Sequence, residues 1–217
     1  MHTFKHTRQQ GFIQAALLFG IALMTAILGG FALANRSPTS QTDTEQAKVN
    51  ASVILKQGSD LRDGVGRYAS DFGASAVINT LDFSATANTG LFDPAARYAS
   101  PQIMPSSAFA GAKTIASPSA AAAGHWHLNK ATPGNGLASG AADPMVALVD
   151  IREDVCGRVN TLLYGSNTIP TTGAAATAWT GGTDAGLSGV AGVSGWPEGC
   201  IETSDGDFVY FKVVQEN

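Results

Sequence analysis

Residues 11–34 read GFIQAALLFGIALMTAILGGFALA, and this stretch decides how the rest of the chain can be arranged. The 23 residues from Phe12 to Ala34 carry no charge. At a rise of about 1.5 Å per residue, a helix of that length spans the hydrocarbon core of a bilayer, which is about 30 Å thick. The stretch therefore predicts a membrane-spanning helix or a secretion signal.

The segment in front of Gly11 is short and basic. It reads MHTFKHTRQQ and includes Lys5 and Arg8 but no acidic residue. By the positive-inside rule, this end of the chain stays in the cytoplasm and the part after the apolar stretch is exported. We therefore expect residues 35–217 to lie outside the cytoplasm.

Two cleavage sites are compatible with this N-terminus. Cleavage after Gly11 would leave the apolar stretch on the mature chain, which would then begin at Phe12. Cleavage after Ala34, at the A-x-A tripeptide Ala32-Leu33-Ala34, would remove the whole stretch as a secretory signal. The apolar region of a signal normally has about 7–15 residues. The one here has 23, which favours cleavage after Gly11.

A short basic leader that ends in Gly11, followed by Phe12 and an unbroken apolar helix, resembles the N-terminus of type IV pilins and pseudopilins. The resemblance implies a leader of residues 1–11, removed by a prepilin peptidase, and an assembly helix over residues 12–34. It implies a structural subunit of a type IV pilus or type II secretion-like filament, held in the inner membrane before assembly. Its partners would be copies of itself or other pilins in an extracellular or periplasmic filament.

The fifth residue counted from Phe12 departs from the family pattern. Most pilin-like proteins carry a glutamate there, which is thought to pair with the N-terminal ammonium of a neighbouring subunit. Here the residue is Ala16, and the nearest polar side chain is Gln14. An amide can form hydrogen bonds but cannot neutralise an ammonium. The departure favours a minor pilin, a tip pseudopilin or a divergent major subunit.

Residues 35–72 are expected to continue the N-terminal helix outside the membrane. Pro38 predicts a kink or a break at its start. Apolar residues then recur at steps of four and three, which predicts a helix over residues 42–72 with one apolar face. This stripe consists of Ile54, Gly58, Leu61, Val65, Tyr68 and Phe72. In a pilin it would pack on the globular head, and an ordinary surface helix of a secreted domain would show the same pattern.

The remaining residues 73–217 are enough for one globular head with a modest core. The resemblance implies an α+β fold, in which a long N-terminal helix, with a membrane-spanning half and an amphipathic half, packs on a small antiparallel sheet. Loss of the two leader cations would reduce the 13 basic residues to 11, against 17 acidic residues, which is a net charge of −6. An acidic chain of this kind is not expected to bind nucleic acid.

The middle of the chain, residues 71–128, is rich in Ala, Ser, Thr, Gly and Pro and predicts short strands and loops. Asp93-Pro94 and Ser100-Pro101 predict turns. His125-Trp126-His127 predicts a strand with Trp126 facing the core. Two histidines on one face of a strand could bind a metal ion, but a third ligand is missing.

The C-terminal third predicts three further strands and a helix, which lies between the first of these strands and Gly165. Residues 145–149 predict a buried strand, and Asp150 and Glu153 have the spacing of a capping box that would start the helix. The apolar positions expected on that helix are Ile151, Val155, Val159 and Leu162. Residues 201–203 and 208–214 predict a hairpin across a turn at residues 204–206.

The chain has two cysteines, Cys156 and Cys200. In an exported protein they most simply form a disulfide bond, which would close a loop of about 45 residues and contribute roughly 4 kcal/mol to stability. Their spacing does not resemble the C-x-x-C motif of a redox pair. The resemblance implies the same, because many type IV pilins have a disulfide-bounded C-terminal region.

The sequence contains no catalytic motif that we can assign, and we expect neither an enzyme nor a cofactor. Asp205 and Asp207 flank a turn glycine, but two acids are too few for an EF-hand calcium loop. The alternative to a filament subunit is a secreted or periplasmic binding domain, released by signal peptidase after Ala34.

Overall fold

The computed structural model describes residues 38–111, 125–137 and 140–216. The chain divides into two compact units, Met1–Thr44 and Glu45–Asn217. In the first unit only the beginning of helix α2 is described, so the architecture below is that of the second unit. The expected leader and assembly helix lie outside the described residues.

Helix α2 (Pro38–Phe72) is the longest element and has 35 residues. Pro38 is its first residue, where proline is tolerated because its missing N–H would have no partner within the helix. Four members of the predicted apolar stripe, Ile54, Leu61, Val65 and Tyr68, are fully buried, which confirms the predicted face. The prediction for Phe72 is wrong: this last residue of α2 is 42% exposed, and its ring packs beside those of Tyr68 and Tyr98.

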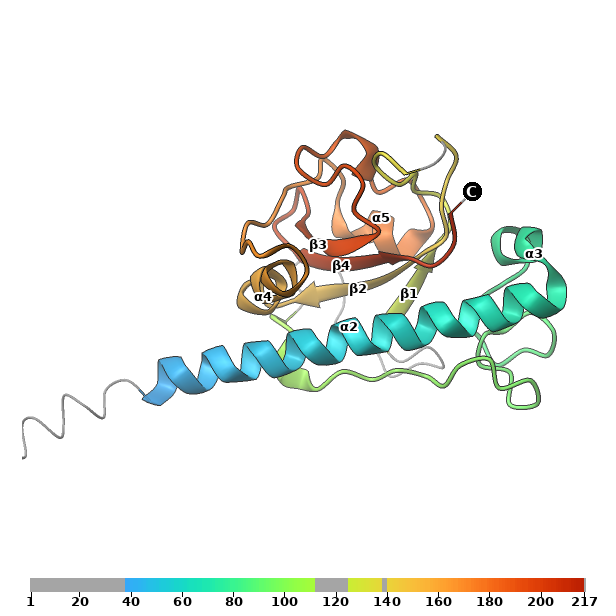
Figure 1. Cartoon of the computed structure of the whole chain (residues 1–217), viewed down its shortest axis with the longest axis horizontal. Coiled ribbons are helices and arrows are strands. Elements are labelled where there is room, and N and C mark those ends of the chain that lie inside the picture. The colour runs from blue at the N-terminus through green and yellow to red at the C-terminus, as the bar shows by residue number, and fades with distance from the viewer. Residues whose placement is uncertain (1–37, 112–124, 138–139, 217) are drawn as a thin grey trace, which may run out of the picture. The chain divides into compact units, whose positions relative to one another are not determined.

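The sheet has four antiparallel strands in the order β1-β2-β4-β3 (Figure 1). These are β1 (Trp126–Asn129), β2 (Met145–Ile151), β3 (Glu198–Glu202) and β4 (Phe208–Val213). The expected α+β class, with a small antiparallel sheet, is thereby confirmed. The predicted strands and the hairpin across residues 204–206 are also confirmed, although β2 and β3 are longer than predicted.

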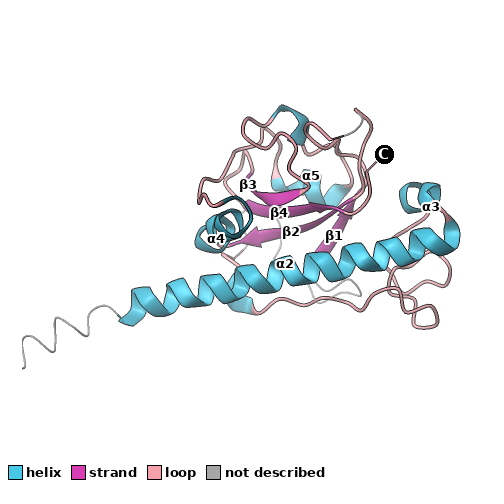
Figure 2. Ribbon diagram, viewed as in Figure 1, coloured by secondary structure: helices cyan, strands magenta, loops and turns pink. Residues whose placement is uncertain are grey.

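The sheet is covered on both faces, because side chains along a strand alternate between its two sides. One face packs against α2 and α4 through Trp126, Val146, Leu148, Cys200 and Tyr210. The opposite face packs against the short helix α5 (Ala176–Gly181) and the loop up to residue 196, through Met145, Ala147, Val149, Ile201, Val209, Phe211 and Val213. Figure 2 shows α2 and α5 on opposite sides of the strands.

The prediction that Asp150 starts a helix through a capping box is wrong. Strand β2 continues to Ile151, and Arg152 is the N-cap of helix α4 (Glu153–Tyr164). The ladder between β2 and β4 shifts register between Leu148 and Ile151, and Asp150 has a φ of 60°. This β-bulge turns Ile151 toward α2, where it is fully buried. Burial of Ile151 in the sheet therefore outweighs the local helix-start signal.

Helix α4 otherwise follows the prediction. Val155 and Val159 are fully buried, and Gly165 ends the helix in the left-handed conformation with a φ of 72°. Leu162, which was expected on the buried face, is 50% exposed. In this last turn of α4 the neighbouring Leu163 packs against the core instead.

Between α2 and β1 the structure describes residues 73–111 and 125, and these consist mainly of loops with isolated bridges. The predicted loops are confirmed there, whereas the predicted short strands do not occur among these described residues. The turn at Asp93-Pro94 is confirmed, since the Asp93 side chain accepts the N–H of Ala95. Ser100-Pro101 lies in an extended segment and makes no turn. The short helices that we did not predict are α3 (Ala74–Asn79), η1 (Ser106–Ala108), α5 and η2 (Leu187–Gly189).

Candidate functional site

The residues predicted to direct cleavage and assembly are Gly11, Phe12, Gln14 and Ala16, and they lie outside the described residues. Two regions of the described chain remain as candidates. One is the contact between α2 and the sheet. The other is the disulfide-bounded region, residues 156–200, which contains both predicted cysteines.

The predicted disulfide bond is present. It joins Cys156 in α4 to Cys200 in β3, with the two Cα atoms 5.4 Å apart. Both cysteines are fully buried on the α2 side of the sheet. The bond therefore ties α4 to the edge strand of the sheet.

Asn160, one helical turn beyond Cys156, completes this connection. Its Oδ1 accepts the N–H of Cys200 at 2.9 Å, and its Nδ2 donates to the carbonyl of Cys200 at 2.8 Å. Nδ2 also donates to the carbonyl of Thr168. The side-chain amide thus takes the place that the backbone of a further strand would have beside β3. The sequence held no signal for this role beyond the four-residue spacing from Cys156.

The outer edge of β3 is closed on both sides of Cys200 as well. Toward the start of the strand, the Tyr164 hydroxyl donates to the carbonyl of Glu198. Toward its end, the N–H of Glu202 donates to the carbonyl of Pro170 and its carbonyl accepts the N–H of Thr172, both at 2.8 Å. Closed edges protect a sheet against pairing with other chains. The disulfide-bounded region is therefore organised as a cover for the edge of the sheet.

The contact between α2 and the sheet depends on Gly58. A Cβ at this position would lie 2.7 Å from the hydroxyl oxygen of Tyr210, which is closer than atoms can approach. Glycine costs about 1 kcal/mol relative to alanine inside a helix. Here it allows α2 to lie directly on β4.

A buried polar cluster adjoins this glycine. Nζ of Lys212 lies 2.9 Å from Oε2 of Glu198 and 3.0 Å from Oγ of Ser59 in α2, and the Tyr210 hydroxyl donates to the same carboxylate at 2.7 Å. Lys212 is only 6% exposed. Burial, and after it the neighbouring Glu198 charge, raises the pKa of Tyr210 well above its ordinary value. Buried ion pairs add little net stability, but breaking one is costly, so the cluster fixes the position of α2 on the sheet.

Trp126 makes a second polar contact with α2. Its Nε1 donates to Oε1 of Gln57 at 3.0 Å, and its ring is buried against that of Tyr210. The predicted inward orientation of Trp126 is confirmed. Gln57 in turn donates through Nε2 to the carbonyl of Ile103.

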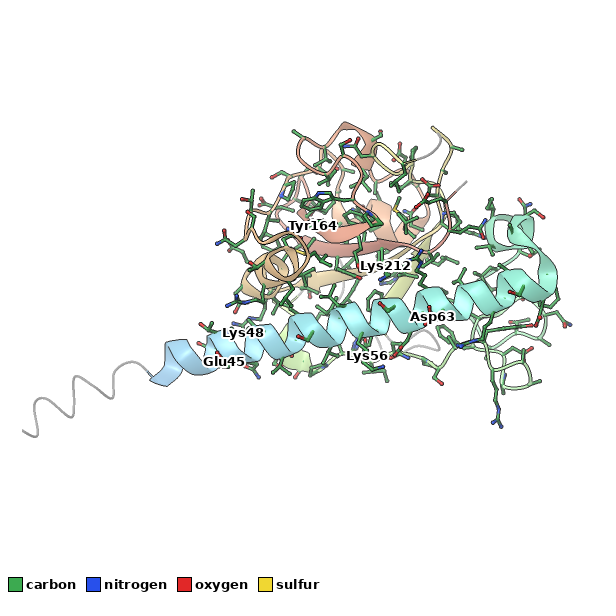
Figure 3. The ribbon with its side chains drawn as sticks, in the orientation of Figure 1. Glu45, Lys48, Lys56, Asp63, Tyr164 and Lys212 are labelled. Carbon is green, nitrogen blue, oxygen red and sulfur yellow. A yellow bond between two sulfur atoms is a disulfide. The ribbon has the colours of Figure 1, made fainter. Side chains whose placement is uncertain are left out.

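The opposite side of α2 is charged (Figure 3). Lys48 pairs with Glu45 at 2.6 Å, and Lys56 pairs with Asp60 at 2.7 Å. Both pairs are exposed, and the two charges within each pair cancel. The helix is thus amphipathic along the part that packs on the head, with its apolar side fully occupied by the sheet.

His125, directly before β1, and His127, within it, are partly buried and contact neighbouring parts of the fold. Nδ1 of His125 accepts the N–H of Met104. Burial lowers the pKa of both His125 and His127 below the ordinary value. Across the described residues, no group of three or more His, Cys, Asp or Glu side chains is arranged to hold a metal ion.

Comparison with known proteins gives no match to a protein-family model, a curated protein or a solved structure. Among residues 38–111, 125–137 and 140–216, no helix combines the length and the apolar character needed to cross a membrane. The sequence of residues 11–34 and the geometry of the head therefore carry the functional argument.

Proposed function

We propose that this protein is a structural subunit of a type IV pilus or type II secretion-like filament. It would be cut after Gly11 and assembled through the apolar helix that begins at Phe12. In this proposal residues 73–217 form the head, and α2 links the head to the assembly helix. The absence of a glutamate at Ala16 favours a minor pilin or pseudopilin over an ordinary major pilin.

The observation that carries the proposal is the placement of α2. It begins at Pro38, close in sequence to the uncharged stretch that ends at Ala34, and its apolar stripe packs lengthwise on an antiparallel sheet. The disulfide between Cys156 and Cys200, which anchors the C-terminal region, also supports the proposal.

The mechanism would be interfacial. A stretch of 23 uncharged, mainly apolar residues is compatible with lipid or with a bundle of similar helices, but not with water. Polymerisation would move the stretch from lipid into a bundle of similar helices. No catalytic group is required for this exchange.

Cell-surface filaments test the proposal. We expect the protein in the filament fraction that is sheared from cells, and we expect Gly11→Val to abolish its cleavage and to retain it in the inner membrane. The matched variant Ala34→Val should leave cleavage and filament incorporation unchanged. The reverse result, with Ala34→Val blocking release and Gly11→Val without effect, would support the secreted binding domain instead.

A further inference from the structure

A segment that we call the strap, residues 98–110, runs alongside α2 in the opposite direction (Figure 1). Three side chains on one side of α2, spaced seven and fourteen residues apart, hold it. The bonds are Asn50 Nδ2 to Ser107 Oγ at 3.4 Å, Gln57 Nε2 to the Ile103 carbonyl at 3.2 Å, and the Tyr98 hydroxyl to Asp71 Oδ2 at 2.7 Å. The strap is therefore fixed to α2 at both ends and near its middle.

The middle of the strap also contacts His125, the residue directly before β1. The N–H of Met104 donates to Nδ1 of the His125 ring at 3.0 Å. The backbone N–H of His125 donates to the carbonyl of Gln102 at 3.3 Å. Met104 is only 2% exposed, so its N–H depends on this ring for a hydrogen-bond partner.

The bond to Met104 requires an unprotonated Nδ1. In neutral imidazole one nitrogen is an acceptor, whereas in imidazolium both nitrogens are donors. Protonation of His125 would therefore turn an attraction into a clash of two N–H groups and leave the N–H of Met104 unpaired. An unpaired buried donor destabilises the conformation that buries it.

We propose that His125 is an acid-sensitive catch for the strap, and that protonation of its ring releases the residues around Met104 while α2 and the sheet stay folded. The inference concerns the head alone and goes beyond the proposed role in a filament. It is a conformational response to acid built into the contact between the strap and β1.

The groups around His125 favour the neutral ring. The strap has no charged side chain from residue 100 to residue 110, and the α2 side chains that hold it, Asn50 and Gln57, are uncharged. The titratable group of β1 is His127. The strap also pairs through its backbone with two charged residues, Asp150 in β2 and Arg152 at the N-cap of α4. Burial lowers the pKa of the His125 ring below its ordinary value, so the ring is neutral and holds the strap at neutral pH, and the contact is lost as the pH falls through that lowered pKa.

Hydrogen–deuterium exchange of the purified full chain in detergent tests this inference. Labelling at about pH 7.5 and about pH 5, with times corrected for the intrinsic rate, should show exchange in residues 100–106 accelerated about tenfold at the lower pH. Peptides from α2 and β4 should exchange equally at both values. Exchange in residues 100–106 that does not depend on pH, or acceleration throughout the head, would overturn the proposal.

Two variants distinguish the effect of His125 from that of His127. His125→Asn places a carbonyl oxygen near the position of Nδ1 and does not titrate, so its strap should stay protected at both pH values. His127→Asn should keep the response of the wild type. A response that persists in His125→Asn, or disappears in His127→Asn, would contradict the assignment to His125. The wild-type comparison remains decisive where a variant fails to fold.

Discussion

The two faces of the sheet are covered in different ways. On one face a single long helix, α2, packs through a regular apolar stripe, and the disulfide bond and α4 lie on the same side. On the other face, the short helix α5 and glycine-rich loops cover a second core around Trp179 and Phe211.

The second face is held by individual hydrogen bonds instead of a repeating pattern. Asn129 is its centre: Oδ1 accepts from the backbone of Ala131 and Thr132 and from the Thr132 hydroxyl, and Nδ2 donates to the carbonyls of Ala178 and Thr183. These bonds join the turn after β1 to helix α5 and to the residues that follow it. The comparison shows that the α2 face combines periodic packing with buried hydrogen bonds, whereas the α5 face has no long helix and depends more on individual side-chain hydrogen bonds.

Loss of the disulfide should have the largest effect on the α2 face. Replacing both Cys156 and Cys200 with alanine should lower the free energy of unfolding by about 4 kcal/mol, because the loop between them is long. Urea unfolding of the wild type, with and without reductant, measures the same quantity. A midpoint that does not respond to reductant would show that the bond contributes little.

Leu61→Ala should rank next, with a loss of about 3 kcal/mol, because it opens a cavity under the centre of α2. The matched control is Val49→Ala on the same helix, whose side chain is 61% exposed. The control should change stability by less than about 0.5 kcal/mol. Equal effects of the two variants would mean that α2 is not seated on the sheet as described.

Asn129→Ala tests the other face. It should cost about 2 kcal/mol, since it leaves buried backbone groups unpaired. Asn167→Ala, at an exposed position, is the control and should be neutral within about 0.5 kcal/mol. Chemical denaturation of both variants measures the difference, and a neutral Asn129→Ala would argue against specification by hydrogen bonds.

Alkaline pH should weaken the contacts of two tyrosines. The hydrogen bond to Asp71 raises the pKa of Tyr98 to about 12, and burial raises the pKa of Tyr164 to about 12. The folded state thus favours the neutral form of each tyrosine. Their contribution to the free energy of unfolding is complete below pH 10 and is lost as the pH rises toward 12. The ultraviolet absorbance of tyrosinate should show late titration in the wild type and one late group fewer in Tyr98→Phe. Titration of both at pH 10 would contradict these contacts.

The smallest effect is expected at the exposed charges of α2. Lys48→Ala removes the pair with Glu45 and should change stability by less than about 0.5 kcal/mol, because exposed ion pairs contribute little. Thermal unfolding at low and high salt measures it. A larger loss would show that the charged side of α2 takes part in the fold.

The same comparison explains which elements could be predicted from sequence. The stripe of α2 follows from its side-chain period, and strands β2 and β4 follow from short apolar runs and the turn signal at residues 204–206. Cys156 and Cys200 pair as expected for two cysteines in an exported chain. Helix α5 has only six residues and no period of its own, so nothing in the sequence distinguishes it from the loop around it. The strand edge closed by Asn160 is equally hidden, because one amide provides the contact.

Asp150 illustrates a conflict between local and long-range signals. Its spacing from Glu153 is that of a helix start, but pairing of Ile151 with Phe208 keeps it in the strand. The polar cluster of Lys212, Glu198 and Ser59 could not be predicted either, since Ser59 and Lys212 lie 153 residues apart in sequence. Such contacts depend on the assembled fold.

The mass of the mature protein tests the central claim most directly. Intact mass spectrometry of the protein purified from its native membrane or filament should give a chain that starts at Phe12, with or without an N-terminal methyl group. That result would identify residues 12–34 as an assembly helix that stays attached to the head. A chain that starts at Asn35 would contradict the account and leave a secreted domain in place of a filament subunit.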